Sequence, residues 1–220
     1  MNGIELEKLK GFLIITGLPG SGIGSYEMWL ISSLVYNGKR LLYTTYGHDE
    51  MKHRAFPKLK YMEFKLDYSA DTLFQESTIC TLPIHKETNV DDYLSELINL
   101  GTSYSAVNEE EIYLILYNID KPLERNKLLP LLITAKKSLL KIILFSRTPS
   151  NISKEIIELF VTWICFRHNY PPVVDLVGEH MRMNDDDSKN MVNALKNGEY
   201  LIYNDELKCF QKNSIEIWHG

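Results

Sequence analysis

The stretch that most constrains the fold is a glycine-rich segment at residues 17–25, which reads Gly-Leu-Pro-Gly-Ser-Gly-Ile-Gly-Ser. It follows an apolar run at residues 12–16, typical of a buried strand, and precedes a helical pattern at about 25–36. A strand, a glycine-rich turn and a helix in this order are the setting of a phosphate-binding loop, whose backbone N–H groups cradle an anion at a helix N-terminus. The segment therefore predicts an anion-binding turn after the first strand.

The loop departs from the phosphate-binding pattern at its two chemically active side chains. The pattern G-x-x-x-x-G-K-[ST] calls for lysine at position 23 and serine or threonine at position 24, but this chain has Ile23 and Gly24 there. Ser25 comes one residue after the position of the hydroxyl. In a working loop the lysine reaches the β- and γ-phosphates and the hydroxyl holds Mg²⁺. We therefore expect a vestigial nucleotide or anion site. Its candidate residues are Gly17, Gly20, Ser21, Gly22, Ile23, Gly24 and Ser25.

Composition indicates one soluble globular domain. The chain has 220 residues, 45% hydrophobic and 24% charged, and its net charge of -5 argues against a protein coated in positive charge, although a local basic groove remains compatible. Its three cysteines are widely spaced, so we expect buried free thiols and a reducing compartment. No run approaches the ~20 apolar residues that span a bilayer, and the N-terminus lacks a signal-peptide pattern. We expect a cytoplasmic protein that does not bind membranes.

Apolar strand patterns alternate with helical patterns along most of the chain. We expect strands at 12–16, 41–45, 61–66, 78–82, 112–117, 141–145 and 160–166. We expect helices at 25–36, near 52–54, at 89–101, within 123–140, at 152–159 and from 185. This order predicts a three-layer α/β fold with a mostly parallel central sheet, helices on both faces and a C-terminal β-hairpin at 198–210.

Three local expectations accompany this reading. In the helix at 25–36, Met28, Ile31, Ser32 and Val35 are expected to form one face. Residues 102–111 are polar and acidic, so we expect a surface linker after a helix that Gly101 closes. The Pro171–Pro172 pair is expected to interrupt the regular pattern.

The order of the pieces resembles the RecA-like branch of the P-loop NTPases over roughly residues 8–170. The segments that carry the resemblance are the loop at 17–25, the tract at 37–43, the strand at 112–117, and the segments 144–150 and 162–167. Within that branch the chain is similar to the RecA/RadA/KaiC group, to the HerA/FtsK DNA pumps and to Zot-like phage morphogenesis ATPases. The resemblance implies a RecA-like core at 1–170, with 171–220 as an extension packed on the same domain.

The resemblance also locates two further catalytic positions, and both are altered. A magnesium-holding aspartate would follow the strand at 112–117, where Tyr117 and Asn118 stand and Asp120 lies beyond the strand end. A catalytic glutamate would follow the strand at 41–45, where residues 46–47 are Tyr-Gly and residues 49–50, Asp-Glu, come late. Because three independent positions fail together, we expect no catalytic residues, no metal, and neither efficient hydrolysis nor tight Mg-nucleotide binding. No cofactor is expected, and any binding of ATP or ADP is expected to be weak.

Other polar residues carry weaker hypotheses. Candidate sensor or finger residues at strand ends are Ser146, Arg147 and Arg167; the alternatives are a turn-capping surface arginine at Arg147 and a structural salt bridge at Arg167. Candidate single-stranded nucleic-acid contacts, interleaved with Phe56 and Tyr61, are Lys52, His53, Arg54, Lys58 and Lys60. The alternative for this cluster is a solvated helix face.

The sequence favours a degenerate, non-hydrolysing RecA-like protein. It would act as a binding or scaffold subunit in DNA recombination, repair or packaging, as a homo-oligomer or in a complex with an active RecA-like paralog, with single-stranded DNA as a further candidate partner. One alternative is an active NTPase motor in which Ser25, Glu50 and Asp120 take displaced roles. Another is an interaction protein that binds no nucleotide.

Overall fold

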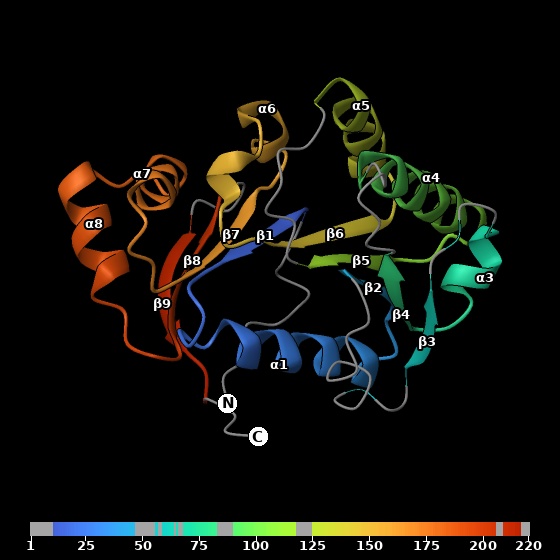
Figure 1. Cartoon of the computed structure of the whole chain (residues 1–220), viewed down its shortest axis with the longest axis horizontal. Helices are drawn as coiled ribbons and strands as arrows, with labels where there is room; N and C mark the ends of the chain where they lie inside the picture. The colour runs from blue at the N-terminus through green and yellow to red at the C-terminus, as the bar shows by residue number, and fades with distance from the viewer. Residues whose placement is uncertain are drawn as a thin grey trace.

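The described strands form one nine-stranded sheet in the order β3-β4-β2-β5-β6-β1-β7-β8-β9 (Figure 1). The computed structural model describes residues 11–46, 56, 59–63, 65, 68–82, 90–117, 125–205 and 209–216. The strands are β1 Leu13–Thr16, β2 Arg40–Tyr46, β3 Lys60–Glu63, β4 Thr78–Leu82, β5 Ile112–Tyr117, β6 Leu140–Phe145, β7 Thr162–Phe166, β8 Glu199–Asn204 and β9 Cys209–Ser214. The strands from β3 to β7 pair in parallel, whereas β8 and β9 add an antiparallel hairpin to β7.

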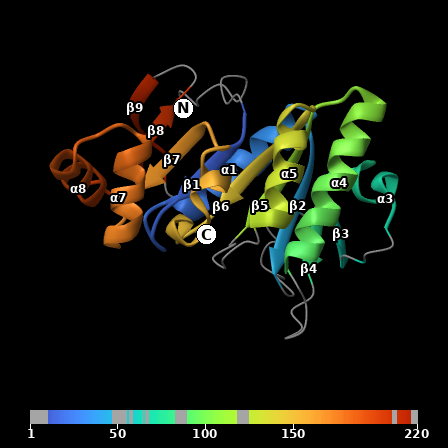
Figure 2. The ribbon, with the colours of Figure 1, turned by 90° about the horizontal axis from the view of Figure 1, so that it is seen from above.

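Helices cover both faces of the sheet, so the expected three-layer α/β fold is confirmed. They are α1 Ile23–Tyr36, α3 Ala70–Phe74, α4 Val90–Asn108, α5 Arg125–Lys136, the 3₁₀ turn η2 Pro149–Asn151, α6 Lys154–Ile157, α7 Pro171–His180 and α8 Asp185–Asn193. In Figure 1, α1 lies on one face and α4 to α7 lie on the other. Seen from above, α3, α4 and α5 lie side by side on this face of the sheet (Figure 2). No helix in the described ranges is long and apolar enough to cross a membrane.

Alternation along β1 divides its side chains between two apolar cores. Leu13 and Ile15 pack in the core under α1, and Ile14 packs in the core under the opposite helices. Both faces of this strand are buried, as expected for a central parallel strand covered on two sides. Its neighbours are β6 and β7, so the loop that follows β1 emerges between the carboxyl ends of these two strands.

The inward face of α1 differs from the expected one. Its buried residues are Tyr26, Glu27, Leu30, Ile31 and Leu34. Of the predicted set, Ile31 is buried, Met28 and Val35 are half-buried against the same core, and Ser32 is exposed. The buried face includes a glutamate, which apolar periodicity alone does not assign to a core, and this explains the error.

The expected linker at 102–111 is wrong for most of its length, because α4 continues through Gly101 to Asn108. A side chain at Gly101 would place its Cβ 3.1 Å from a Leu140 methyl and 3.2 Å from the ring of Phe74. The glycine therefore allows α4 to lie close to its neighbours and does not end the helix. Tyr104 and Ser105, which were expected to face solvent, are buried.

The proline pair also has a different role from the expected one. Pro171 and Pro172 occupy the first positions of α7, where proline is tolerated because the N–H it lacks would have no partner within the helix. The helix expected at 152–159 is limited to α6, with η2 before it. The strand expected at 61–66 ends at Glu63, and the hairpin extends to Ser214. The short helix expected near 52–54 lies outside the described residues.

Candidate functional site

The glycine-rich loop turns sharply between β1 and α1. Gly20 and Gly22 have φ values of 78° and 105°, in the left-handed region that favours glycine. Gly22 is the N-cap of α1, no side chain caps this end, and the first turn contains no acidic residue. The first N–H groups of the helix therefore have no side-chain acceptor from the cap, and the helix dipole is positive at this end.

Neighbouring strands hold this loop in place through backbone contacts. The Leu18 N–H donates to the Arg167 carbonyl after β7 (3.1 Å), and the Gly198 N–H before β8 donates to the Ser21 carbonyl (2.8 Å). A Cβ on Gly22 would lie 2.8 Å from the Gly198 Cα. The C-terminal hairpin is thus bonded to the loop, and the two backbones meet where only glycine fits.

A cavity of about 190 Å³ opens beside the loop. Its walls come from the loop, α1 and the carboxyl ends of β5 and β6, and the lining residues are Pro19, Gly20, Ile23, Gly24, Glu27, Tyr117, Phe145, Ser146 and Arg147. Ligands of open parallel sheets bind at this edge of the sheet. The cavity therefore occupies the position at which the loop would present a ligand.

Three of the seven predicted anion-site residues line this cavity, namely Gly20, Ile23 and Gly24. Gly17, Ser21, Gly22 and Ser25 do not line it. Ser21 is fully buried, and a Cβ on Gly17 would lie 2.9 Å from its Oγ. The position that the pattern reserves for lysine therefore faces the cavity with an apolar isoleucine.

Glu27 is the residue of the site that sequence reasoning missed. It lies four residues after Ile23, which places both side chains on the same face of α1. It is 1% exposed, lines the cavity, and its Oε1 accepts a hydrogen bond from the Tyr43 hydroxyl (2.5 Å). The helical spacing from the lysine position was the signal that could have identified it. The cavity thus carries a buried carboxylate on the helix that would present a phosphate-binding lysine.

Aromatic rings adjoin this carboxylate. The ring centroids of Tyr43 and Tyr117 are 5.8 Å apart, and those of Tyr117 and Phe145 are 5.9 Å apart. Tyr117 and Phe145 are the last residues of β5 and β6 and pair with each other across the two strands. The aromatic wall of the cavity is therefore set by strand register.

Ser146 and Arg147 extend β6 to the rim of the cavity. Ser146 is buried, and its N–H donates to the Ile15 carbonyl of β1 (3.1 Å); Arg147 is exposed and lines the cavity.

His168, just beyond β7, makes two hydrogen bonds to the backbone. Its Nε2 lies 2.9 Å from the Arg147 carbonyl oxygen, and its Nδ1 accepts a hydrogen bond from the Tyr170 N–H (3.3 Å). Nε2 is therefore the donor to Arg147. Burial lowers the pKa of His168, and the hydrogen bond to Arg147 offsets this in part.

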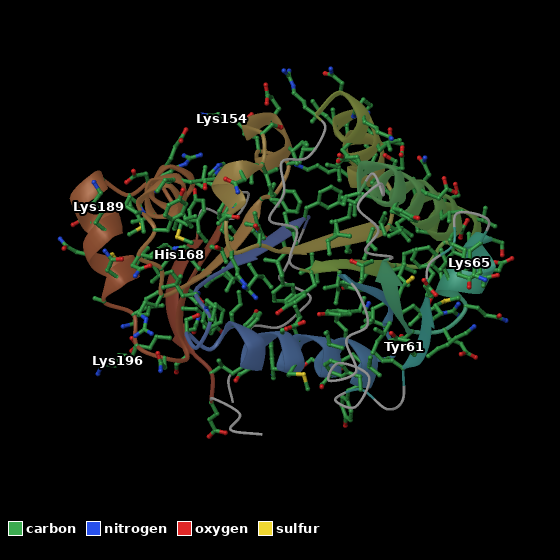
Figure 3. All side chains as sticks on the ribbon, viewed as in Figure 1. Tyr61, Lys65, Lys154, His168, Lys189 and Lys196 are labelled. Atoms are coloured by element: carbon green, nitrogen blue, oxygen red, sulfur yellow. The ribbon has the colours of Figure 1, made fainter. Side chains whose placement is uncertain are left out.

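The other predicted residues that the structure describes, Arg167 and Lys60, do not line this cavity. Arg167 contributes its backbone carbonyl to the loop and does not line the cavity. Lys60 is exposed at the start of the edge strand β3, and in Figure 3 its neighbour Tyr61 lies far along the sheet from His168. The predicted residues that lie outside the described ones are Gly47, Asp49, Glu50, Lys52, His53, Arg54, Lys58, Asn118 and Asp120. Within the described ranges, no group of three or more His, Cys, Asp or Glu residues could hold a metal ion.

Several solved structures share this fold. The genome packaging NTPase B204 of Sulfolobus turreted icosahedral virus 2, in complex with AMP, matches with a TM-score of 0.72 and 14% identity over 94% of this chain and 98% of that chain. VirB4 of Thermoanaerobacter pseudethanolicus has a TM-score of 0.60 and 9% identity, covering 96% and 90% of the two chains. The bacterial conjugative coupling protein TrwBΔN70 matches with a TM-score of 0.62 and 8% identity over 94% of this chain and 85% of that chain.

These similarities show that the chain has the fold of P-loop NTPases, as the loop and the strand order had predicted. No protein-family model matches the sequence. A comparison with curated proteins finds no significant match.

Proposed function

We propose that this chain is a non-hydrolysing P-loop protein that serves as a binding or scaffold subunit of a DNA-processing assembly. The observation that carries this proposal is the pair of residues on α1 that face the cavity. Ile23 stands where a phosphate-binding lysine is needed, and Glu27 is a buried carboxylate on the same wall. The fold is that of P-loop NTPases, and the isoleucine and glutamate on α1 argue against the binding of a triphosphate in the cavity.

Magnitudes support the loss of hydrolysis. Removing one preorganised group that stabilises transition-state charge costs about 3–4 kcal/mol, or a factor of about 10²–10³ in rate. A carboxylate at about 4 Å from a phosphate oxygen adds a repulsion of about 4 kcal/mol at an effective dielectric constant of about 20. The helix N-terminus provides the equivalent of only about half a positive charge, so it does not compensate for both effects.

A role in DNA processing is supported by the functions that the similar structures are named for. B204 is described as a genome packaging NTPase, and TrwB as a conjugative coupling protein. We infer that this chain works in DNA packaging or transfer, with recombination and repair as less supported settings. As a subunit without its own hydrolysis, it would assemble with further copies or with an active paralog. Lys60, exposed on the β3 edge, stays a candidate contact for single-stranded DNA.

Turnover of radiolabelled ATP tests the proposal. Wild-type protein is expected to release no phosphate above a heat-inactivated control with Mg²⁺ or Mn²⁺. A pull-down with single-stranded and double-stranded DNA, together with sedimentation, tests the assembly role. ATP turnover by the wild type would overturn the non-hydrolysing assignment, and absence of any association with DNA or with a P-loop partner would overturn the scaffold role.

An active NTPase with displaced residues is the second candidate, and one observation favours it. Arg147 follows β6 and lines the cavity. Its guanidinium could therefore bind a phosphate in place of the lysine that the pattern expects on α1. This reading requires ATP turnover by the wild type that Arg147→Ala abolishes while the unfolding transition is unchanged. If turnover is absent with every metal tested, this candidate is excluded.

A further inference from the structure

We propose that His180, the last residue of α7, is a pH-sensitive switch between this helix and the sheet. Its neutral ring packs on Trp163 of β7, and its protonated ring moves into an adjoining cavity that carboxylates line. This cavity shares no lining residue with the one beside the glycine-rich loop, so the switch is independent of the proposed function.

The ring of His180 lies against a side chain that the sheet holds in place. The centroids of the His180 and Trp163 rings are 4.6 Å apart, and the ring planes are inclined by 16°. Trp163 is buried, and its indole N–H donates to the Phe160 carbonyl (3.0 Å). Nε2 of His180 is shielded from solvent and has no hydrogen-bond partner among the described residues. A neutral imidazole tolerates this position, because one of its two nitrogens carries no hydrogen.

Protonation makes the stacked position unfavourable. An imidazolium carries a hydrogen on both nitrogens, so Nε2 would become a buried donor without an acceptor. Such a donor is costly to leave unpaired, and more so when it belongs to a charged group. Burial accordingly lowers the pKa of His180, and the carboxylates of Glu179 and Glu158 offset this effect only in part. The face of Trp163 attracts a cation, but it supplies no oxygen that could accept from Nε2.

A cavity of about 350 Å³ adjoins the two rings and offers space for the protonated one. An imidazole ring needs the volume of only a few water molecules, each of which occupies about 30 Å³ in the liquid. The walls come from α6, the end of α7 and the strands β7 and β8. The charged and titratable residues that line the cavity besides His180 are Lys154, Glu158, Glu179, Arg182, Tyr203 and Asp205.

The charges around this cavity favour an imidazolium. Among the described residues, three carboxylates and two cations line it. Lys154 pairs with Glu179, and Arg182 pairs with Asp205 (2.8 Å). Glu158 belongs to neither pair and is exposed. A protonated ring that enters the cavity therefore exchanges a dry position for water and a carboxylate acceptor, and the end of α7 loses its stacking contact with β7.

NMR spectroscopy during a titration from about pH 7.5 to 5 tests the switch, because this range covers the charge change of histidine. The readouts are the ring resonances of His180, the indole N–H resonance of Trp163, and the nuclear Overhauser effects between the two rings. We expect His180 to titrate below the usual value of about 6.5, the indole resonance to shift with the same midpoint, and the Overhauser effects to disappear on protonation. His180→Phe keeps a ring that cannot be protonated, so the indole shift should be lost.

Glu158→Gln tests the acceptor in the cavity. It removes the charge of the exposed carboxylate with little change of shape, so the midpoint of His180 should fall by about half a pH unit, which is an about threefold lower proton affinity. Glu155→Gln is the matched control, because Glu155 lies on α6 and does not line the cavity. This variant should move the midpoint by less.

Overhauser effects that persist when His180 is fully protonated would overturn the switch. An indole shift that is unchanged in His180→Phe would do the same, as would a midpoint in Glu158→Gln equal to that of the wild type. The wild-type Overhauser effects decide the question even if His180→Phe does not fold.

Discussion

Glycines in the loop are required for different reasons, so replacing each of them with alanine should lower the free energy of unfolding by different amounts. Gly22→Ala places a side chain at φ 105° and 2.8 Å from the Gly198 backbone, so we expect the free energy of unfolding to fall by about 2–4 kcal/mol. Gly20 has a φ of 78°, so Gly20→Ala strains the backbone, but the added Cβ would meet no atom within 4 Å. We expect this variant to lower the free energy of unfolding by about 1–2 kcal/mol. Urea denaturation followed by circular dichroism measures both changes.

Gly24→Ala is the matched control for this series. Gly24 lies in α1, does not need a positive φ, and a Cβ added to it would enter open space. Alanine favours the helix by up to about 1 kcal/mol over glycine, so this variant should be as stable as the wild type or more stable. Equal destabilisation by all three substitutions would show that the loop is not held by its contact with Gly198.

His168 predicts a pH dependence of stability. Burial lowers its folded-state pKa, so the folded protein holds the neutral imidazole that donates to the Arg147 carbonyl. The unfolded chain binds a proton more readily, near the usual value of about 6.5. The stability that neutral His168 contributes is therefore fully present above the pKa of the unfolded state and is lost as the pH falls toward the lower pKa of the folded state. His168→Gln should show a shallower loss of stability than the wild type when unfolding free energies are compared from about pH 7.5 to 5.5.

Burial also lowers the pKa of His180, so the wild-type slope reports both histidines. The difference between wild type and His168→Gln isolates the contribution of His168. Equal slopes in the two proteins would contradict the predicted shift. A direct NMR titration of the His168 ring provides an independent check.

Part of the site could be predicted from residues alone. The absence of lysine at Ile23 and of a hydroxyl at Gly24 is visible in the sequence because the loop pattern fixes their positions. Glu27 could not be assigned to the cavity by apolar periodicity, because that pattern counts a glutamate as solvent-facing. Its inward position depends on Tyr43 of a strand 16 residues away, which supplies the hydrogen bond that permits burial.

At the scale of elements, α4 shows why a glycine can be misread. Gly101 resembles a helix stop, but it lies within α4 against Leu140 and Phe74. Gly101→Val should lower the free energy of unfolding by about 1–3 kcal/mol, because the added methyl groups overpack this contact. Urea unfolding measures the change.

Ser103→Val is the control on the same helix, since Ser103 is exposed. It introduces the same side chain with the same helix propensity, and should change stability by no more than about 0.5 kcal/mol. If both valine variants are equally stable, the close approach of α4 to its neighbours is not the reason for glycine at 101.

The elements that sequence reasoning placed correctly are those with the strongest local signal. The runs at β5 and β6 are nearly all apolar, which is what strands buried on both faces require. α7 was missed because proline was taken as a break, although its position in the first turn is compatible with a helix. The mostly parallel sheet followed from the alternation of strands and helices along the chain, whereas the order of the strands within the sheet and the pairing of Gly198 with the loop have no local signal.

At the scale of the whole molecule, the fold of an NTPase is combined with a cavity that is lined by an isoleucine and a buried glutamate on α1. β1, β5 and β6 end at the same edge of the sheet, so a ligand bound at the carboxyl ends of these strands would occupy this cavity. On its other side the loop is bonded to the C-terminal hairpin, because the Gly198 N–H donates to the Ser21 carbonyl. The proposed function requires that the side chains of this cavity, and not its backbone frame, exclude a nucleotide.

Isothermal titration calorimetry with Mg²⁺ and ATP shows whether these side chains exclude a nucleotide. The samples are the wild type, the double variant Ile23→Lys with Gly24→Thr, and the triple variant that adds Glu27→Gln. We predict no saturable heat for the wild type, weak binding for the double variant because Glu27 still faces the site, and binding at least about tenfold tighter for the triple variant. Micromolar binding of Mg·ATP by the wild type would contradict the account.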